Sequence, residues 1–383
     1  MNREQWIELS KEYSERDKEL LLRAYDILIS NIYEKDAGYL WSPYRCISPA
    51  RRFFLGIWNW DSAFHSIGMS RIDNEIAKEG ILGFLKFQRA DGLLPDVIWE
   101  RGEIEDSYSK PPVFPWAAEI VYKKDKDINF LKEIYPKFVL NENYIVKNRS
   151  YEGLFYYDAD NKEKDDYITR VKWESGWDNS VRWDNGITNY WAIDLNCFMV
   201  LFYRAMSYFA QELNLIEDYN LWSEKEKVLT KQINEHLWDN KNQWYADADR
   251  FTKEVSPSLT PASFMPLFIG IATKEQGEKM AYIAKTKFKC KMPTVSFDNP
   301  EYSNDYWRGP TWINTAYFAA KGLKIYGYND VADAIKNSVL DMCFYDKGGL
   351  FQNYNSITGE GQYRKCNNFS WSSVFVIEFI LNF

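Results

Sequence analysis

Apolar residues recur at helical spacing along almost the whole chain, and this pattern limits the fold more than any other feature. One stretch near the N-terminus has them at three- and four-residue intervals, at Leu20, Leu21, Ala24, Tyr25 and Leu28. Such spacing is typical of a helix with one buried face. Similar stretches lie near residues 74–89, 114–123, 128–148, 195–209, 219–237, 274–288, 311–326, 330–343 and 370–381. We therefore predict an all-α fold.

Strand-like alternation is limited to short pieces, Gly153–Tyr157 and Trp244–Ala248. No Pro-, Gly- or Ser-rich linker and no block of charge divides the sequence, so we predict a single domain over residues 1–383. Helices alternate with loops, several of them long, and long loops in a compact domain usually carry function. The expected architecture is a stack of helical hairpins whose loops build a site on one face.

Composition excludes several classes of function. The chain has 47 basic and 55 acidic side chains, for a net charge of −8, and it therefore lacks the basic surface that nucleic acids require. No apolar run approaches the roughly 20 residues that span a bilayer, and residues 1–22 do not resemble a secretory signal. Five scattered cysteines and two histidines predict no zinc site. We expect a cytoplasmic protein with no nucleic-acid or membrane partner, no metal and no cofactor.

Aromatic residues make up 17% of the chain, including 16 tryptophans, and many of them lie beside acids, amides or arginines instead of in apolar runs. Most of these rings are expected to belong to the core. Tryptophans in polar loops favour a flat, amphipathic pocket wall, because sugars offer C–H faces to rings and hydroxyls to neighbouring polar groups.

The first polar and aromatic segment, residues 49–65, contains Arg52, Trp58, Trp60 and Asp61. An aspartate beside a tryptophan can accept hydrogen bonds from two sugar hydroxyls while the ring stacks on the sugar. The alternative is that Asp61 caps a helix that begins at Ser62, which is a common use of aspartate.

Two further segments supply cationic candidates. Lys110 lies in a proline-containing loop, where it can donate to a substrate hydroxyl or simply remain solvated. Arg308 precedes Pro310, which is expected to open the following helix. Arg308 and Trp312 would then lie at a helix entrance, where the guanidinium can contact substrate or orient a carboxylate.

Three acids and three tryptophans lie within residues 173–184, a concentration that packing alone does not explain. A carboxyl between indole rings is partly desolvated, which raises its pKa and suits a general acid that protonates a glycosidic oxygen. We predict this role for Asp178, which follows Trp177. The alternative pairs Asp178 with Arg182 at i,i+4 on a helix.

The last two segments lie near the C-terminus. Residues 349–360 include Gln352 and a turn of a kind that is usually structural. Trp371 is placed at the start of the last predicted helix, on the same loop face as the other segments.

Taken together, these segments resemble the inverting glycosidases of the trehalase and glycoside hydrolase family 63 group. The first is similar to the trehalase signature Pro-Gly-Gly-Arg-Phe…Trp-Asp-Ser, with Arg52 and Asp61 at its arginine and aspartate. Residues 173–184 resemble Glu-Ser-Gly-x-Asp-x-Ser-x-Arg-Trp, whose aspartate, here Asp178, is the general acid of the group. The segment around Arg308 resembles the family 63 motif Tyr-Trp-Arg-Gly-Pro-x-Trp.

The resemblance implies an (α/α)6 barrel with a pocket where the loops converge. It also implies hydrolysis of an α-glycosidic bond with inversion, as in an α-glucosidase acting on a small neutral or glycerate-like glycoside. This mechanism needs two carboxyl groups about 6.5–9.5 Å apart, so that a water fits between the sugar and the base. Asp178 would protonate the leaving oxygen. The expected substrate-binding residues are Arg52, Trp58, Trp60, Asp61, Lys110, Trp177, Arg308, Trp312 and Trp371.

The chain departs from the pattern of the group at the general base. The group has a glutamate in a segment like Glu-Asn-Tyr-Asn-Pro-x-Thr-Gly, and this chain has Gln352 at that place. An amide has no carboxylate that accepts a proton at neutral pH, so Gln352 cannot be a general base. We favour an inactivating Glu-to-Gln change. The alternatives are a lineage that has lost the base or moved it to Glu360, and a misaligned loop.

Two other functions compete with an α-glycosidase. A non-catalytic carbohydrate-binding protein on a glycosidase scaffold would suit Gln352. An unsaturated uronyl hydrolase would need basic residues for the carboxylate of its substrate, and the candidate segments offer only Arg52, Lys110 and Arg308.

Overall fold

The computed structural model describes all 383 residues and is predominantly helical, as predicted. Its helices are α1 (Arg3–Ser10), α2 (Glu15–Ser30), α3 (Asn59–Met69), α4 (Asn74–Leu85), α5 (Phe114–Asp125), α6 (Ile128–Arg149), α7 (Tyr167–Ser175), α8 (Ile193–Glu212), α9 (Ile216–His236), α10 (Met265–Phe268), α11 (Lys274–Thr286), α12 (Ile313–Ile325), α13 (Asn329–Tyr345) and α14 (Ser370–Leu381). None of them is long and apolar enough to cross a membrane.

The strands are short and lie in the loops between helices. They are β1 (Gly56–Trp58), β2 (Val97–Trp99), β3 (Ile104–Glu105), β4 (Ser150–Tyr151), β5 (Leu154–Phe155), β6 (Tyr190–Trp191), β7 (Trp238–Asp239), β8 (Trp244–Tyr245) and β9 (Ala248–Asp249). β5 and β8 fall inside the two stretches predicted to be strand-like. All strand pairs are antiparallel, and the largest sheet has the order β1-β2-β3.

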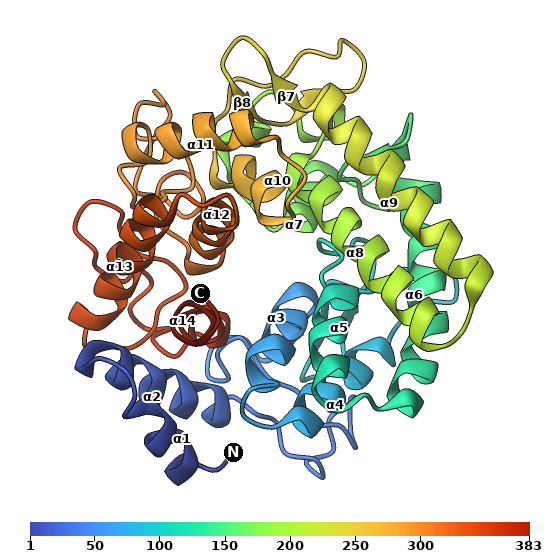
Figure 1. Cartoon of the computed structure of the whole chain (residues 1–383). Coiled ribbons are helices and arrows are strands. Elements are labelled where there is room, and N and C mark those ends of the chain that lie inside the picture. The colour runs from blue at the N-terminus through green and yellow to red at the C-terminus, as the bar shows by residue number, and fades with distance from the viewer.

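The helices form two concentric layers around a central axis (Figure 1). In the inner layer, α3 packs on α5, α5 on α8, α8 on α10, α10 on α12 and α12 on α14, and α14 returns to α3. Outer helices cover them: α2 packs on α14, α4 on α3, α6 on α5, α9 on α8, and α11 and α13 on α12. The first and last parts of the chain thus close the ring together.

The distribution of buried residues around a helix depends on whether the helix belongs to the inner or the outer layer. Helix α14 belongs to the inner layer and has buried residues on every side, from Ser370 to Ile380. Helix α9 belongs to the outer layer and buries only Trp222, Leu229 and Ile233, which form the single stripe of an amphipathic surface helix. One hydrophobic cluster of 109 buried residues connects the two layers.

The loops that enter α3, α5, α12 and α14 meet at one end of the ring, because the chain reaches each of these inner helices after leaving the outer layer. The β1-β2-β3 sheet supports two of them. Within it Gly56 lies opposite Trp99 and Trp58 opposite Val97. A Cβ at Gly56 would come within 2.5 Å of the Ile98 carbonyl oxygen, so the close approach of these strands requires glycine.

Candidate active site

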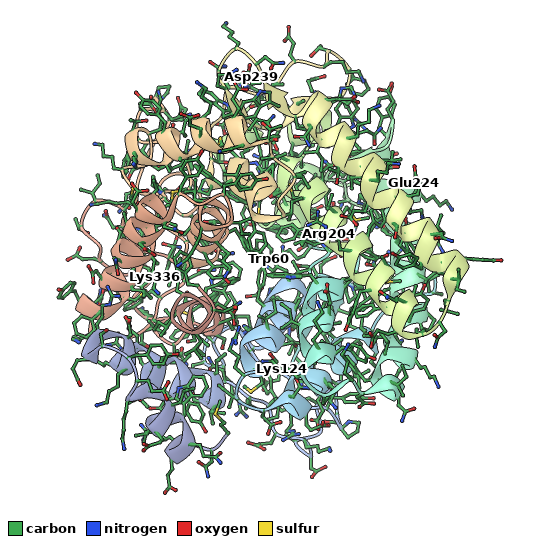
Figure 2. The ribbon with its side chains drawn as sticks, viewed as in Figure 1. Trp60, Lys124, Arg204, Glu224, Asp239 and Lys336 are labelled. Atoms are coloured by element: carbon green, nitrogen blue, oxygen red, sulfur yellow. The ribbon has the colours of Figure 1, made fainter.

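A cavity of about 360 Å³ opens where these loops meet. Of the eleven residues predicted to form the site, eight line it: Trp58, Trp60, Asp61, Lys110, Asp178, Trp312, Gln352 and Trp371. Trp60 projects toward the centre of the ring (Figure 2). Each of the six predicted segments contributes at least one of these side chains, so segments far apart in the sequence do converge on one cavity.

Asp178 lies in the loop that follows α7, and the local sequence explains its position. Gly176 ends α7 with a φ of +73°, and a Cβ there would come within 2.4 Å of the Trp60 ring, so this turn requires glycine. The Asp178 side chain lines the cavity. Burial raises the pKa of Asp178 to about 6, while Lys110 opposes this rise and Asp96 adds to it.

Arg182 does not pair with Asp178, so the alternative role for Asp178 is wrong. The Arg182 guanidinium donates instead to Asp194 and Asp247 at 2.7–2.9 Å, and all three side chains are buried. Asp178 also lies outside any helix, so the i,i+4 geometry of a helical pair does not arise. The Asp178 carboxyl therefore has no ion pair with Arg182, and it lines the cavity.

Asn179 holds the loop that carries Asp178. Its side-chain Oδ1 accepts from the Trp307 backbone N–H at 2.8 Å, and its Nδ2 donates to Asp305 at 2.8 Å. The Asn179 carbonyl also accepts from Arg308 at 3.2 Å. These contacts join the Asp178 loop to the loop that enters α12, and they fix the backbone next to the proposed acid.

Tyr306 connects Asp178 with Gln352. The Gln352 Nε2 donates to the Tyr306 hydroxyl at 3.3 Å, and a hydrogen bond from the same hydroxyl lowers the pKa of Asp178. Burial raises the pKa of Tyr306 well above its ordinary value, so the phenol stays protonated. Asp178, Tyr306 and Gln352 all line the same cavity.

Two further carboxyls share the cavity with a single lysine. Lys110 Nζ lies 3.1 Å from Asp96 Oδ1 and also donates to the Trp173 carbonyl. Burial raises the pKa of Asp61 to about 7 and also raises the pKa of Asp96, and in both cases Lys110 opposes the shift. Asp61 is the third residue of α3, and the residue before that helix is Trp58. The alternative that Asp61 caps the helix is therefore wrong.

Tryptophans form one wall of the cavity. Trp307 and Trp312 stack with ring centroids 3.6 Å apart and 13° between their planes. Trp371 meets Trp312 edge-on at 5.4 Å and Trp60 at 5.3 Å. Such a wall presents flat apolar faces of the kind that sugar rings contact. Trp177 packs behind it, 4.8 Å from Trp307, and does not line the cavity.

Two other predicted residues also lie outside the cavity. Arg308 donates to both Asp184 oxygens at 2.8 Å and does not line the cavity. Arg52 is exposed and makes no hydrogen bond or ion pair. Glu360, the suggested alternative base, is exposed as well and does not line the cavity. The structure does not bring these three charges to the proposed reacting atoms.

Comparison with known proteins places this geometry in a family. Residues 55–372 match the family described as the mannosylglycerate hydrolase MGH1-like glycoside hydrolase domain. The chain belongs to this family of glycoside hydrolases. It is 24% identical over 414 residues to the mannosylglycerate hydrolase MGH1 of Selaginella moellendorffii, covering 87% of this chain and 81% of that one. It is 23% identical to a mannosylglycerate hydrolase of Thermus thermophilus, covering 86% and 95%.

Solved structures share the fold of this glycoside hydrolase. A family 63 mannosylglycerate hydrolase of Thermus thermophilus, crystallised with Tris and D-glycerate, superimposes with a TM-score of 0.79 at 22% identity, covering 94% of this chain and 99% of that one. The neutral trehalase Nth1 of Saccharomyces cerevisiae gives a TM-score of 0.75 at 18% identity, covering 88% and 73%. The resemblance drawn from the sequence, to trehalases and family 63, is confirmed.

Sequence reasoning missed several polar side chains of this glycoside hydrolase cavity. Asp96, Glu105, Tyr108 and Tyr306 line it but were not among the predicted site residues. Asp96 belongs to a segment whose Asp-Gly and Pro residues indicate only a turn. Tyr306 lies two residues before Arg308, in a segment from which only Arg308 and Trp312 were predicted to bind substrate. No group of three or more His, Cys, Asp and Glu side chains is arranged to hold a metal ion.

Proposed function

We propose that this glycoside hydrolase cleaves the α-glycosidic bond of a small glycoside with inversion, with Asp178 as general acid and residue 352 facing the nucleophile. The single observation that supports the proposal most is the arrangement of Asp178 and Gln352 around one Tyr306 hydroxyl in a tryptophan-walled cavity. We also propose that the two helical layers form an (α/α)6 barrel that acts as one catalytic domain.

Asp178 is suited to donate a proton at neutral pH. With its pKa raised to about 6, about a tenth of the molecules carry the proton at pH 7, whereas an exposed aspartate would carry it in fewer than about one in a thousand. When the proton passes to the leaving oxygen, the new carboxylate keeps its hydrogen bond from Tyr306 and the attraction of Lys110. The environment therefore favours both protonation and proton transfer.

Gln352 occupies the position from which a water would be activated. Its Oε1 can accept a hydrogen bond from that water, but an amide does not take up the proton. Hydrolysis by this chain is therefore expected to be slow, and a glutamate at position 352 would supply the missing base. A non-catalytic sugar-binding protein is the second candidate function, and the same amide is the observation that favours it.

The charges in the cavity favour a neutral sugar ring over an acidic one. Its lining has a single cation, Lys110, which already pairs with Asp96. The other charged side chains are acids, which would repel the carboxylate of a uronic acid. Because Arg52 and Arg308 lie outside the cavity, a uronyl hydrolase is disfavoured.

The leaving group is proposed to be small, with glycerate as one candidate. The relatives named above are mannosylglycerate hydrolases, and one was crystallised with D-glycerate. Here Lys110 is the one cation of the cavity that could attract a glycerate carboxylate. We propose a small α-glucoside or an α-glycoside of glycerate as the substrate.

The test is the Gln352→Glu variant, assayed on α-glucosides, α-mannosides and their glycerate derivatives. We expect it to release the free sugar at least about a hundredfold faster than the unmodified chain, with the β-anomer seen first by proton NMR. Adding Asp178→Asn to this variant should abolish the gain. The exposed Asn240→Asp change, on the loop after β7, controls for the mere addition of a negative charge.

Two outcomes would contradict the proposal. One is a Gln352→Glu variant that folds normally and cleaves none of these glycosides. The other is a gain in activity that survives Asp178→Asn. If calorimetry then shows that the unmodified chain binds one of the sugars, the binding function replaces the catalytic one.

A further inference from the structure

A second hollow adjoins the cavity on the side of Gln352. It has a volume of about 550 Å³, and it shares Phe54, Tyr306 and Gln352 with the cavity. Asp178 does not line it. The hollow therefore reaches the residue that faces the nucleophile without passing the proposed acid.

The two spaces carry opposite charges. The cavity is lined by four acids and one lysine, and the lysine pairs with one of these acids. The hollow has no acid in its lining and has two cations, Arg364 and Lys365. Charge thus changes sign at Gln352, which lines both.

The two cations of the hollow differ in whether an acidic side chain already pairs with them. Arg364 donates to both oxygens of Asp346 at 2.7 and 3.0 Å, so part of its positive charge is neutralised. The negative charge of Glu360 also acts on the Arg364 guanidinium. Lys365 is exposed and makes no hydrogen bond or ion pair. The remaining lining is apolar or uncharged and includes Phe53 and Tyr363, which are exposed. An anion in the hollow would meet a free ammonium group and a partly desolvating wall.

This charge arrangement bears on the missing base. A water must lose a proton as it attacks, and Gln352 cannot take it. An oxyanion attacks without losing a proton, so it needs no general base. Resting on the function proposed above, we propose that the hollow binds inorganic phosphate and that phosphate, in place of water, attacks the sugar, which makes the protein a glycoside phosphorylase.

The reaction balances with the groups at hand. An unprotonated oxygen of HPO₄²⁻ forms a bond to the anomeric carbon as the bond to the leaving oxygen breaks, and Asp178 gives its proton to that oxygen. The products are the free alcohol and the sugar 1-phosphate, with the configuration inverted from α to β. The phosphate ester keeps one proton, which returns to Asp178 directly or through solvent. No oxidant, metal or further co-reactant is required.

The amide at position 352 suits phosphate better than a carboxylate would. A glutamate there would repel the incoming dianion, whereas the Gln352 amide is neutral and has a second N–H besides the one that donates to Tyr306. That N–H can donate to a phosphate oxygen. An amide in place of the carboxylate cannot take a proton from an attacking water. It also does not repel an incoming phosphate dianion.

The experiment compares phosphate with water as the acceptor. Substrates are first chosen as the glycosides that the Gln352→Glu variant hydrolyses. The unmodified full-length chain is then incubated with each of them in phosphate, or in chloride, sulfate or azide at equal ionic strength, and products are followed by phosphorus and proton NMR. We expect a β-configured sugar 1-phosphate, formed at least about tenfold faster than free sugar appears without phosphate.

Charge variants test the site itself. Lys365→Gln should raise the KM for phosphate about threefold or more, because one charge-assisted contact is lost, and should leave the KM for the glycoside unchanged. Lys231→Gln, an exposed change on α9, is the matched control and should alter neither. In the Gln352→Glu variant, phosphate should no longer accelerate cleavage.

The outcomes separate this inference from the function on which it rests. A Gln352→Glu variant that hydrolyses a glycoside, together with an unmodified chain that forms no sugar phosphate from it, overturns phosphorolysis and leaves the glycosidase proposal standing. Product with azide but not with phosphate shows that the hollow admits small anions only, and it overturns the inference as well. If neither the unmodified chain nor the Gln352→Glu variant cleaves any glycoside, the proposed glycosidase function is wrong, and the phosphorolysis that rests on it is wrong as well.

Discussion

Asp61 makes the pH dependence of stability a sensitive test of the site. Burial, together with the nearby Asp96 and Asp178 carboxyls, raises the pKa of Asp61 from 3.8 to about 7, against the opposing effect of Lys110. In the unfolded chain the carboxyl would titrate near its ordinary value. Between these two values the folded state binds more protons than the unfolded state, so the free energy of unfolding falls as the pH rises.

The size of the effect follows from the same two values. At about 1.4 kcal/mol per pH unit, the rise in the pKa of Asp61 corresponds to roughly 4 kcal/mol of stability. This contribution is fully present below pH 4 and is lost as the pH rises through about 7. Asp61→Asn keeps the shape of the side chain but cannot ionise, so the variant should not show this loss.

The assay is urea unfolding of both proteins at several pH values from 4 to 8. Relative to the unmodified chain, Asp61→Asn should become progressively more stable as the pH rises, by several kcal/mol in total, with most of the change before pH 7. Asp165→Asn, an exposed loop change, should follow the unmodified chain throughout. If the difference between Asp61→Asn and the unmodified chain stays within about 0.5 kcal/mol at every pH, the reasoning about this buried carboxyl is refuted.

Two other side chains give predictions of a different kind. Asn179→Ala removes both side-chain hydrogen bonds beside Asp178. In the Gln352→Glu background it should therefore lower kcat by roughly ten- to a hundredfold with little change in KM, and an equal rise in KM instead would contradict a positioning role. Arg182→Met leaves Asp194 and Asp247 buried without their cation. The free energy of unfolding should fall by about 3–5 kcal/mol, as measured by urea denaturation, and a loss below about 1 kcal/mol would show that the pair is dispensable.

The sequence allowed the helical fold and most of the cavity to be predicted, for a physical reason. A chain that alternates between an outer and an inner layer enters its inner helices at one end of the ring. Polar and aromatic residues just before those helices or in their first turn must then meet, whatever their distance in sequence. Asp61 and Trp371 illustrate this, because they come from opposite ends of the chain and line one cavity.

Other parts of the site depend on contacts that local patterns do not reveal. Arg308 was expected near substrate, but its guanidinium is bound by Asp184, which lies 124 positions earlier. Trp177 is adjacent to the proposed acid, yet it faces the core behind Trp307. The role of Tyr306 also depends on a partner from another loop. The spacing of residues along the chain does not determine whether a loop side chain points into the cavity or into the core.

The raised pKa of Asp178 favours the proposed catalytic function over sugar binding alone. A carboxyl whose pKa is raised to about 6 destabilises the folded state at neutral pH by roughly 3 kcal/mol relative to an ordinary aspartate. A residue that only binds sugar does not need this raised pKa, since an exposed aspartate or an amide also accepts a hydrogen bond from a sugar hydroxyl. A group that must deliver a proton does gain, because the raised pKa keeps about a tenth of the molecules protonated at pH 7. The raised pKa of Asp178 therefore supports its proposed role as general acid, and what Gln352 leaves open is the identity of the nucleophile.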